Sequence, residues 1–226
     1  DAKVPANPQQ FRDLLGKVLI RHRREETAVK FTQRKVHLLP VEFSPAENAL
    51  YKTLNGFIDS CYFSVSHVEK GLNRLTLMLM ERMVTSSPRA LAKTIEKILE
   101  NPFVPYLYAV ALRKVMAEPE KVRMVSKASV VLDLVQRMVE TEGKVIIFTQ
   151  FRESQEYLAE QLLQRDISCV KFYGSLNGRQ KDDAIVQFAT RAKVLVSTDS
   201  GAEGRNLQFC KVVINYDLPW NPMKVE

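Results

Sequence analysis

The sequence predicts an α/β protein in two parts, a mainly helical first half and an open parallel sheet flanked by helices from residue 126 onward. Two patterns predict this division. Apolar residues recur at helical spacing up to residue 125, whereas short runs rich in Val and Ile alternate with amphipathic segments after it. Strands that are apolar on both faces and joined by helices are typical of parallel sheets with right-handed crossovers.

The helical half has its clearest start at Ser44. This residue is a suitable N-cap, Pro45 occupies the first helical position, and Glu47 completes the Ser-x-x-Glu pattern of a capping box. Helical periodicity is expected through three segments: 44–65, 72–84 and 88–100. Breaks containing proline follow at 101–105 and 117–121, so the helical half is expected to end near residue 125.

The sheet half opens with an amphipathic helix that ends at Gly143, a residue type common just past helix C-termini. Four β-branched runs are then expected to be strands: 144–148, 169–173, 193–197 and 212–217. Two helices are expected between them, from about 154 to 165 and from about 179 to 188. The four strands should therefore be parallel and run in one sheet.

Small or polar residues follow three of these strands: Thr149-Gln150, Gly174-Ser175 and Thr198-Asp199. The carboxyl ends of parallel strands lie at one edge of a sheet, where open α/β folds bind ligands. Amides and hydroxyls gathered there suit the binding of phosphate groups. Ordinary turns between strand and helix are the alternative interpretation at this stage.

The charge is unevenly distributed along the chain. Residues 1–125 hold 20 Lys and Arg against 13 Asp and Glu, and the remainder holds 13 of each, so the whole net charge of +7 lies in the first half. A basic surface fits a nucleic-acid partner, but solvated helices explain it equally well. Two interpretations also apply to the cluster of Arg21, Arg23 and Arg24, which could clamp a phosphate or form a solvated patch.

Several other classes of protein are not indicated. The three cysteines are widely separated, which favours reduced thiols in a cytoplasmic protein over a disulfide framework or a metal site. No apolar run reaches the roughly 20 residues that span a bilayer, so no membrane partner is expected. Ser200 lacks the first glycine of the GxSxG pattern, and no histidine follows it, which argues against a serine hydrolase.

Four segments taken together resemble a known family: KVIIFTQF (144–151), FYGSLNGRQK (172–181), VLVSTDSGAEGRNLQ (194–208) and VVINYDLPWNP (212–222). Their order and spacing resemble the second RecA-like domain of helicase superfamily 2, and most closely its SWI/SNF-type DNA-translocating ATPases. The sequence Glu203-Gly204-Arg205-Asn206, followed by LPWNP, resembles that of the bacterial branch that recycles RNA polymerase. The resemblance implies an exit segment from a first RecA-like lobe over 1–43, a helical insertion over 44–125, and a RecA-like lobe over 126–226 that is incomplete because it stops before motif VI.

The resemblance also implies roles for particular residues. Nucleic-acid contacts are implied for six residues: Thr149, Gln150, Gly174, Ser175, Thr198 and Trp220. ATP contacts are implied for three: Glu203, Gly204 and Asn206. Groups that contact the phosphate backbone of the nucleic acid, rather than its base edges, suit a motor that acts irrespective of sequence. Trp220 has burial against the sheet as its alternative, and Ala202 and Asp199 depart from the common family pattern, where glycine and arginine are frequent.

The resemblance implies an ATP-dependent DNA translocase, which uses ATP and Mg²⁺ and acts on double-stranded DNA or on a DNA-bound complex such as RNA polymerase. The sequence has no GxxxxGK[ST] loop and no acidic DExx strand end. We therefore expect this chain alone to be an inactive, monomeric fragment without bound cofactor, from a nucleoid-associated bacterial or archaeal protein. The alternatives are an ATP-independent nucleic-acid-binding or protein-docking module, and a lobe of an RNA helicase.

Overall fold

The computed structural model describes residues 7–19, 35–63, 72–198 and 207–219. The chain divides into two units, residues 1–40 and 41–226, which are treated separately below. In the first unit, helix α1 (Pro8–Val18) is capped by Asn7, whose side chain accepts a hydrogen bond from the backbone N–H of Gln10 at 3.1 Å. All residues of α1 are solvent-exposed.

The helical region of the second unit contains four helices and one short 3₁₀ turn in its described residues: α2 (Pro45–Phe63), α3 (Arg74–Ser86), α4 (Pro88–Leu99), α5 (Tyr106–Met116) and η3 (Pro119–Lys121). The expected capping box of α2 is confirmed. Ser44 N–H donates to Glu47 Oε2 at 2.8 Å, and Glu47 N–H donates to Ser44 Oγ at 3.3 Å. Helix α5 was not expected from the sequence, because prolines at both ends of this short segment suggested only breaks.

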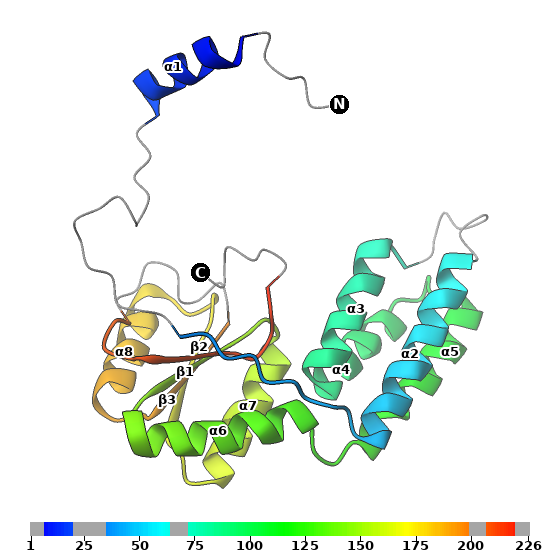
Figure 1. The fold of residues 1–226 in the computed structure, drawn as a ribbon. Coiled ribbons are helices and arrows are strands. Elements are labelled where there is room, and N and C mark those ends of the chain that lie inside the picture. The colour runs from blue at the N-terminus through cyan, green and yellow to red at the C-terminus, as the bar shows by residue number, and fades with distance from the viewer. Residues whose placement is uncertain (1–6, 20–34, 64–71, 199–206, 220–226) are drawn as a thin grey trace. The chain divides into compact units, whose positions relative to one another are not determined.

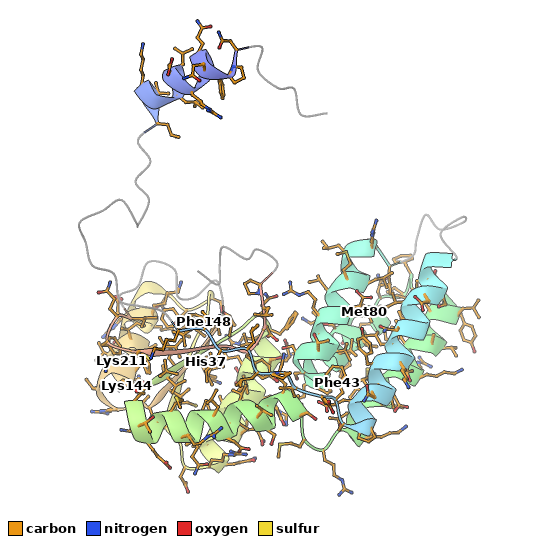
Figure 2. All side chains as sticks on the ribbon, viewed as in Figure 1. His37, Phe43, Met80, Lys144, Phe148 and Lys211 are labelled. Carbon is orange, nitrogen blue, oxygen red and sulfur yellow. The ribbon has the colours of Figure 1, made fainter. Side chains whose placement is uncertain are left out.

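The helical region has its own hydrophobic core (Figure 2). Its fully buried members include Leu54 of α2, Met80 of α3, Leu91 and Ile95 of α4, and Leu112 of α5. The methionine therefore fills space between helices, which is the usual role of this flexible side chain in a core. Each helix contributes one apolar face, as the helical spacing of the sequence predicts.

The rest of the second unit is a four-stranded sheet with helices on both faces (Figure 1). Its elements are α6 (Ser126–Glu142), β1 (Val145–Thr149), α7 (Arg152–Gln164), β2 (Cys169–Phe172), α8 (Gly178–Thr190), β3 (Val194–Thr198) and β4 (Val212–Asn215). The strand order is β2-β3-β1-β4, and all three pairings are parallel. The predicted open parallel sheet is confirmed. Helix α6 ends at Gly143, whose φ of 81° is a conformation that favours glycine.

Alternate residues of the strands enter two different cores. Ile147 and Val196 pack with α6 and α7 on one face, and Ile146 and Leu195 pack with Phe188 of α8 on the other. Successive residues of a strand point to opposite faces of the sheet, and helices cover both faces. Neighbouring positions are therefore both apolar, which explains the continuously apolar runs in the sequence. The functional consequence is that the carboxyl ends of all four strands are held at a single edge, with helices covering both faces behind them.

Candidate functional site

The carboxyl edge of the sheet brings the predicted strand-end residues together. Thr149 at the end of β1 lies opposite Thr198 at the end of β3, and Phe148, Ser197 and Phe172 align one residue earlier. We call this edge the rim. The sequence-based expectation that the strand ends form a common rim is confirmed for β1, β2 and β3, because the parallel register leaves them level.

Five of the predicted site residues lie within the described part of the chain. Gly174 and Ser175 are exposed in the turn after β2, and Gln150 is half-buried after β1. Thr149 and Thr198 are buried. The predicted nucleotide contacts Glu203, Gly204 and Asn206 lie outside the described residues, as do Trp220, Asp199, Ala202 and the cluster Arg21, Arg23 and Arg24.

The two threonines of the rim are less accessible than the exposed turn after β2. The Thr149 hydroxyl donates to Asp217 Oδ2 at 2.6 Å, so its single proton already has an acceptor inside the protein. Thr198 keeps 8% of its surface exposed. Direct phosphate contacts by these side chains stay a prediction, and the accessible hydrogen-bonding groups at the rim are those of Gln150, Gly174 and Ser175.

Asp217 is a buried residue beside the rim that the sequence did not single out. The polypeptide leaves β4 at Asn215, yet Tyr216 N–H still donates to Phe148 O at 2.8 Å, which keeps the following Asp217 against the end of β1. The Asp217 carboxylate is 8% exposed. An acidic residue two positions after the last strand was the available signal in the sequence. Its burial requires several hydrogen-bond donors around the carboxylate.

The positive partner of Asp217 is Lys127, near the start of α6. Its Nζ lies 2.9 Å from Asp217 Oδ1 and 4.1 Å from the centre of the Tyr216 ring. Burial lowers the pKa of Lys127, and the Asp217 carboxylate opposes that change. Burial also raises the pKa of Tyr216 well above its usual value, and the charge of Asp217 adds to this effect. Tyr216 is therefore a neutral hydrogen-bond donor at physiological pH.

A second buried carboxylate, Glu47, joins the helical region to the sheet region. It accepts from the backbone N–H of Ser126 at 2.9 Å and also from the Ser126 hydroxyl. Val125, the N-cap residue of α6, makes no side-chain cap of its own, so Glu47 of α2 supplies that cap from another helix. Burial by itself raises the pKa of Glu47, but hydrogen bonds from Ser126 and Ser44 outweigh it and lower the pKa below its usual value.

Helix α7 contributes two further polar groups close to the rim. Gln155 Nε2 donates to Phe172 O at 3.0 Å and to Val196 O at 2.7 Å, which holds the ends of β2 and β3 together. The Arg152 guanidinium stacks on Tyr173, 3.2 Å from the ring centre, and its NH2 lies 3.3 Å from Glu156. Arg152 thus places positive charge beside the exposed Gly174-Ser175 turn.

The described residues contain no group of three or more His, Cys, Asp or Glu side chains able to hold a metal ion. The three cysteines are free thiols, and burial raises the pKa of each. The residues predicted to contact ATP all lie in 199–206, outside the described part. Within the parts of the chain that are described, no helix is long and apolar enough to cross a membrane.

Comparison with protein families gives a match between residues 126–226 and the helicase conserved C-terminal domain. A relative from Bacillus subtilis (strain 168), named an uncharacterized ATP-dependent helicase YqhH, is 37% identical over 220 residues, which cover 96% of this chain and 38% of that protein. The ATP-dependent RNA helicase eIF4A of Schizosaccharomyces pombe is 33% identical over 96 residues, which cover 42% of this chain and 24% of that protein. Residues 126–226 are therefore a helicase C-terminal domain, and the chain spans well under half of the length of these relatives.

Solved structures agree on the fold. The helicase domain of Pyrococcus furiosus Hef matches with a TM-score of 0.61 at 15% identity, over 99% of this chain and 59% of that one. The SWI2/SNF2 ATPase core of Sulfolobus solfataricus in complex with double-stranded DNA matches with a TM-score of 0.56 at 17% identity, over 82% of this chain and 35% of that one. At these identities the likeness concerns the RecA-like fold alone, and this fold is the one predicted from the sequence.

Proposed function

We propose that this chain, whose second half is a helicase C-terminal domain, supplies the second lobe of an ATP-dependent DNA translocase of the SWI/SNF type. In the parent protein it contributes one side of an ATP site and one side of a track for duplex DNA. Glu203, Gly204 and Asn206 are the residues of this chain that we propose for ATP contacts, and the other lobe would hold Mg²⁺. ATP binding closes the two lobes, and hydrolysis reopens them.

The observation that carries this proposal is the rim. Its accessible groups are a backbone turn with a hydroxyl, at Gly174 and Ser175, and an amide side chain, at Gln150, beside the guanidinium of Arg152. Such groups can hydrogen-bond or pair with phosphate oxygens, which fixes a protein on nucleic acid without reading its sequence. A motor that moves along nucleic acid irrespective of sequence needs this kind of grip.

The helical region is shared with a relative that is itself a helicase. The alignment with the Bacillus subtilis protein, named an uncharacterized ATP-dependent helicase, covers 96% of this chain and so includes that region, whereas the alignment with the eIF4A RNA helicase covers 42% of the chain. The choice of a DNA translocase over an RNA helicase is supported by the resemblance of the motifs to the SWI/SNF type and to the branch that recycles RNA polymerase. A DNA-bound polymerase complex in the bacterial or archaeal nucleoid is accordingly the target we propose.

The RNA-helicase lobe is the second candidate, because a relative named an ATP-dependent RNA helicase, eIF4A, is 33% identical to this chain over 96 residues. A binding assay on the chain separates the two candidates. We expect fluorescence anisotropy to give tighter binding to duplex DNA than to single-stranded or duplex RNA, with an affinity that falls steeply as salt rises. Preference for RNA at every salt concentration would refute the DNA assignment.

A pair of serines provides matched variants for this assay. Ser175 is exposed at the carboxyl end of β2, and Ser168 is exposed just before the amino end of the same strand. Loss of one phosphate hydrogen bond in Ser175→Ala should weaken duplex binding by roughly threefold to tenfold. Ser168→Ala should leave the affinity unchanged, and an equal effect of both variants would exclude the rim as the binding edge.

ATP hydrolysis tests whether the chain is half of a motor. We expect the full-length parent to hydrolyse ATP faster when duplex DNA is added, and this chain alone to hydrolyse none. Hydrolysis by the isolated chain would contradict the half-site proposal. A parent that shows no nucleic-acid-stimulated hydrolysis would instead support an ATP-independent binding module.

A further inference from the structure

The buried Asp217 carboxylate collects hydrogen bonds from three different parts of the fold. Lys127 Nζ of α6 binds Oδ1 at 2.9 Å. Oδ2 accepts from the Ser86 hydroxyl at 2.8 Å, from the Thr149 hydroxyl at 2.6 Å and from the Gln150 N–H at 3.0 Å. Ser86 is the last residue of α3 in the helical region, and Thr149 and Gln150 stand at the rim, so one carboxylate connects the two regions.

Ser86 is itself held on both sides. Its hydroxyl is 2.7 Å from the Ser154 hydroxyl of α7, and its carbonyl oxygen accepts from the Tyr216 hydroxyl at 2.8 Å. Because a hydroxyl has one proton and that of Ser86 goes to Asp217, Ser154 must be the donor to Ser86. Ser86, Ser154 and Tyr216 are all buried, and the hydroxyl of each has an acceptor within this network. The network therefore holds the C-terminal end of α3 in place.

The same network reaches the exposed part of the rim. Gln150 is fixed through its backbone N–H by Asp217, and its Nε2 donates to Leu218 O at 3.1 Å. Arg82, on the last turn of α3, also donates to Leu218 O. The helical region therefore contacts the segment that leaves β4 at two successive residues, Asp217 and Leu218.

We propose that Asp217 is a positioning residue for nucleic-acid binding, which ties Ser86 of the helical region to Gln150 at the rim without contacting nucleic acid itself. This inference rests on the proposed function, since it assigns to the rim the phosphate contacts that Asp217 orients. The carboxylate is too buried to meet a ligand, and its negative charge would repel a phosphate.

The negative charge of Asp217 allows an experiment to distinguish positioning from electrostatics, because the two predict opposite changes in the affinity for duplex DNA. Asp217→Asn removes a negative charge near the proposed DNA track, so electrostatics alone would tighten binding. Loss of positioning should instead weaken duplex binding by about threefold to tenfold. The slope of log affinity against log salt should stay that of the wild type, because Gln150 is neutral and its contact with a phosphate releases no counterion. Ser86→Ala, which changes no charge, should weaken duplex binding by a smaller amount.

Stability is separated from positioning by measuring only folded protein. Each variant is assayed well below its own melting temperature, as determined by circular dichroism, so a merely structural role leaves the affinity of the folded chain unchanged. Asp133→Asn is the matched control, because Asp133 is an exposed carboxylate of α6 that pairs with Arg165. Unchanged or tighter duplex binding by folded Asp217→Asn would overturn the proposal.

Failure of the proposed function and failure of this inference give different results. A wild-type chain that does not bind duplex DNA would refute the proposed function. A wild-type chain that binds duplex DNA, together with an Asp217→Asn variant that binds it equally well, would refute the positioning role alone.

Discussion

Glu47 allows the sharpest prediction about stability, because one side chain caps two helices. It accepts from Ser44 N–H at the start of α2 and from the Ser126 N–H and hydroxyl at the start of α6. Loss of a helix N-cap costs about 0.5–2 kcal/mol. Glu47→Ala removes the cap of α6 and the Glu47 half of the capping box of α2, while Ser44 still caps α2 through its hydroxyl. We therefore expect a loss of about 1–3 kcal/mol in the free energy of unfolding at pH 7.

The pH dependence of this loss follows from the direction of the pKa shift. The folded-state pKa of Glu47 lies below its ordinary value of 4.5, so the unfolded chain binds the proton more readily. The stabilisation is then fully present above pH 4.5 and is lost as the pH falls through the folded-state pKa. The stability gap between wild type and Glu47→Gln should therefore close below pH 4.5.

Urea unfolding followed by circular dichroism at several pH values measures both effects. Glu96, an exposed residue of α4, provides the control Glu96→Gln, which should change stability by less than about 0.5 kcal/mol. A double-mutant cycle with Ser126→Ala isolates the contribution across the two regions. A gap between wild type and Glu47→Gln that stays constant from pH 7 to pH 3 would refute the reasoning.

Three further outcomes are expected. Leu112→Ala empties a fully buried position of the helical core, and should lower the free energy of unfolding by about 2–5 kcal/mol in urea titrations; the exposed Leu107→Ala should cost far less. Gly143→Ala places a side chain at a φ of 81° and should cost about 1 kcal/mol by the same measurement, while Gly56→Ala inside α2, where a Cβ atom has free space, should be neutral or stabilising. Because burial raises the pKa of Cys210, its thiol should react with Ellman's reagent at pH 8 more slowly in the folded chain than in urea; equal rates would contradict its buried setting.

Local patterns were sufficient for much of the fold. The capping box of Ser44 and Glu47, the glycine after α6 and the four strands all depend on residues close together in sequence, where propensity and spacing act directly. The end of the last strand differed from its predicted position. Strand β4 ends at Asn215 rather than at residue 217, because Tyr216 and Asp217 turn to bond with the end of β1 and with the helical region.

The candidate site was predictable in outline only. Parallel strands place their ends at one edge, so the rim could be inferred from sequence, but the burial of the Thr149 hydroxyl could not. Its acceptor lies 68 residues away, and the pair from Ser86 to Asp217 is separated by 131 residues. No periodicity in the sequence reports a contact over such a distance.

The sequence by itself determined most of the helices and strands and the parallel direction of the strands, because these depend on the spacing of apolar residues. It also determined that residues 126–226 resemble a helicase lobe, because that depends on sequence motifs. Only the tertiary structure decided the strand order, the joining of the helical region to α6 through Glu47, and its joining to the rim through Asp217. The physical reason is that a buried carboxylate must find donors wherever the packed chain brings them, and these donors come from helices and strand ends that are distant in sequence.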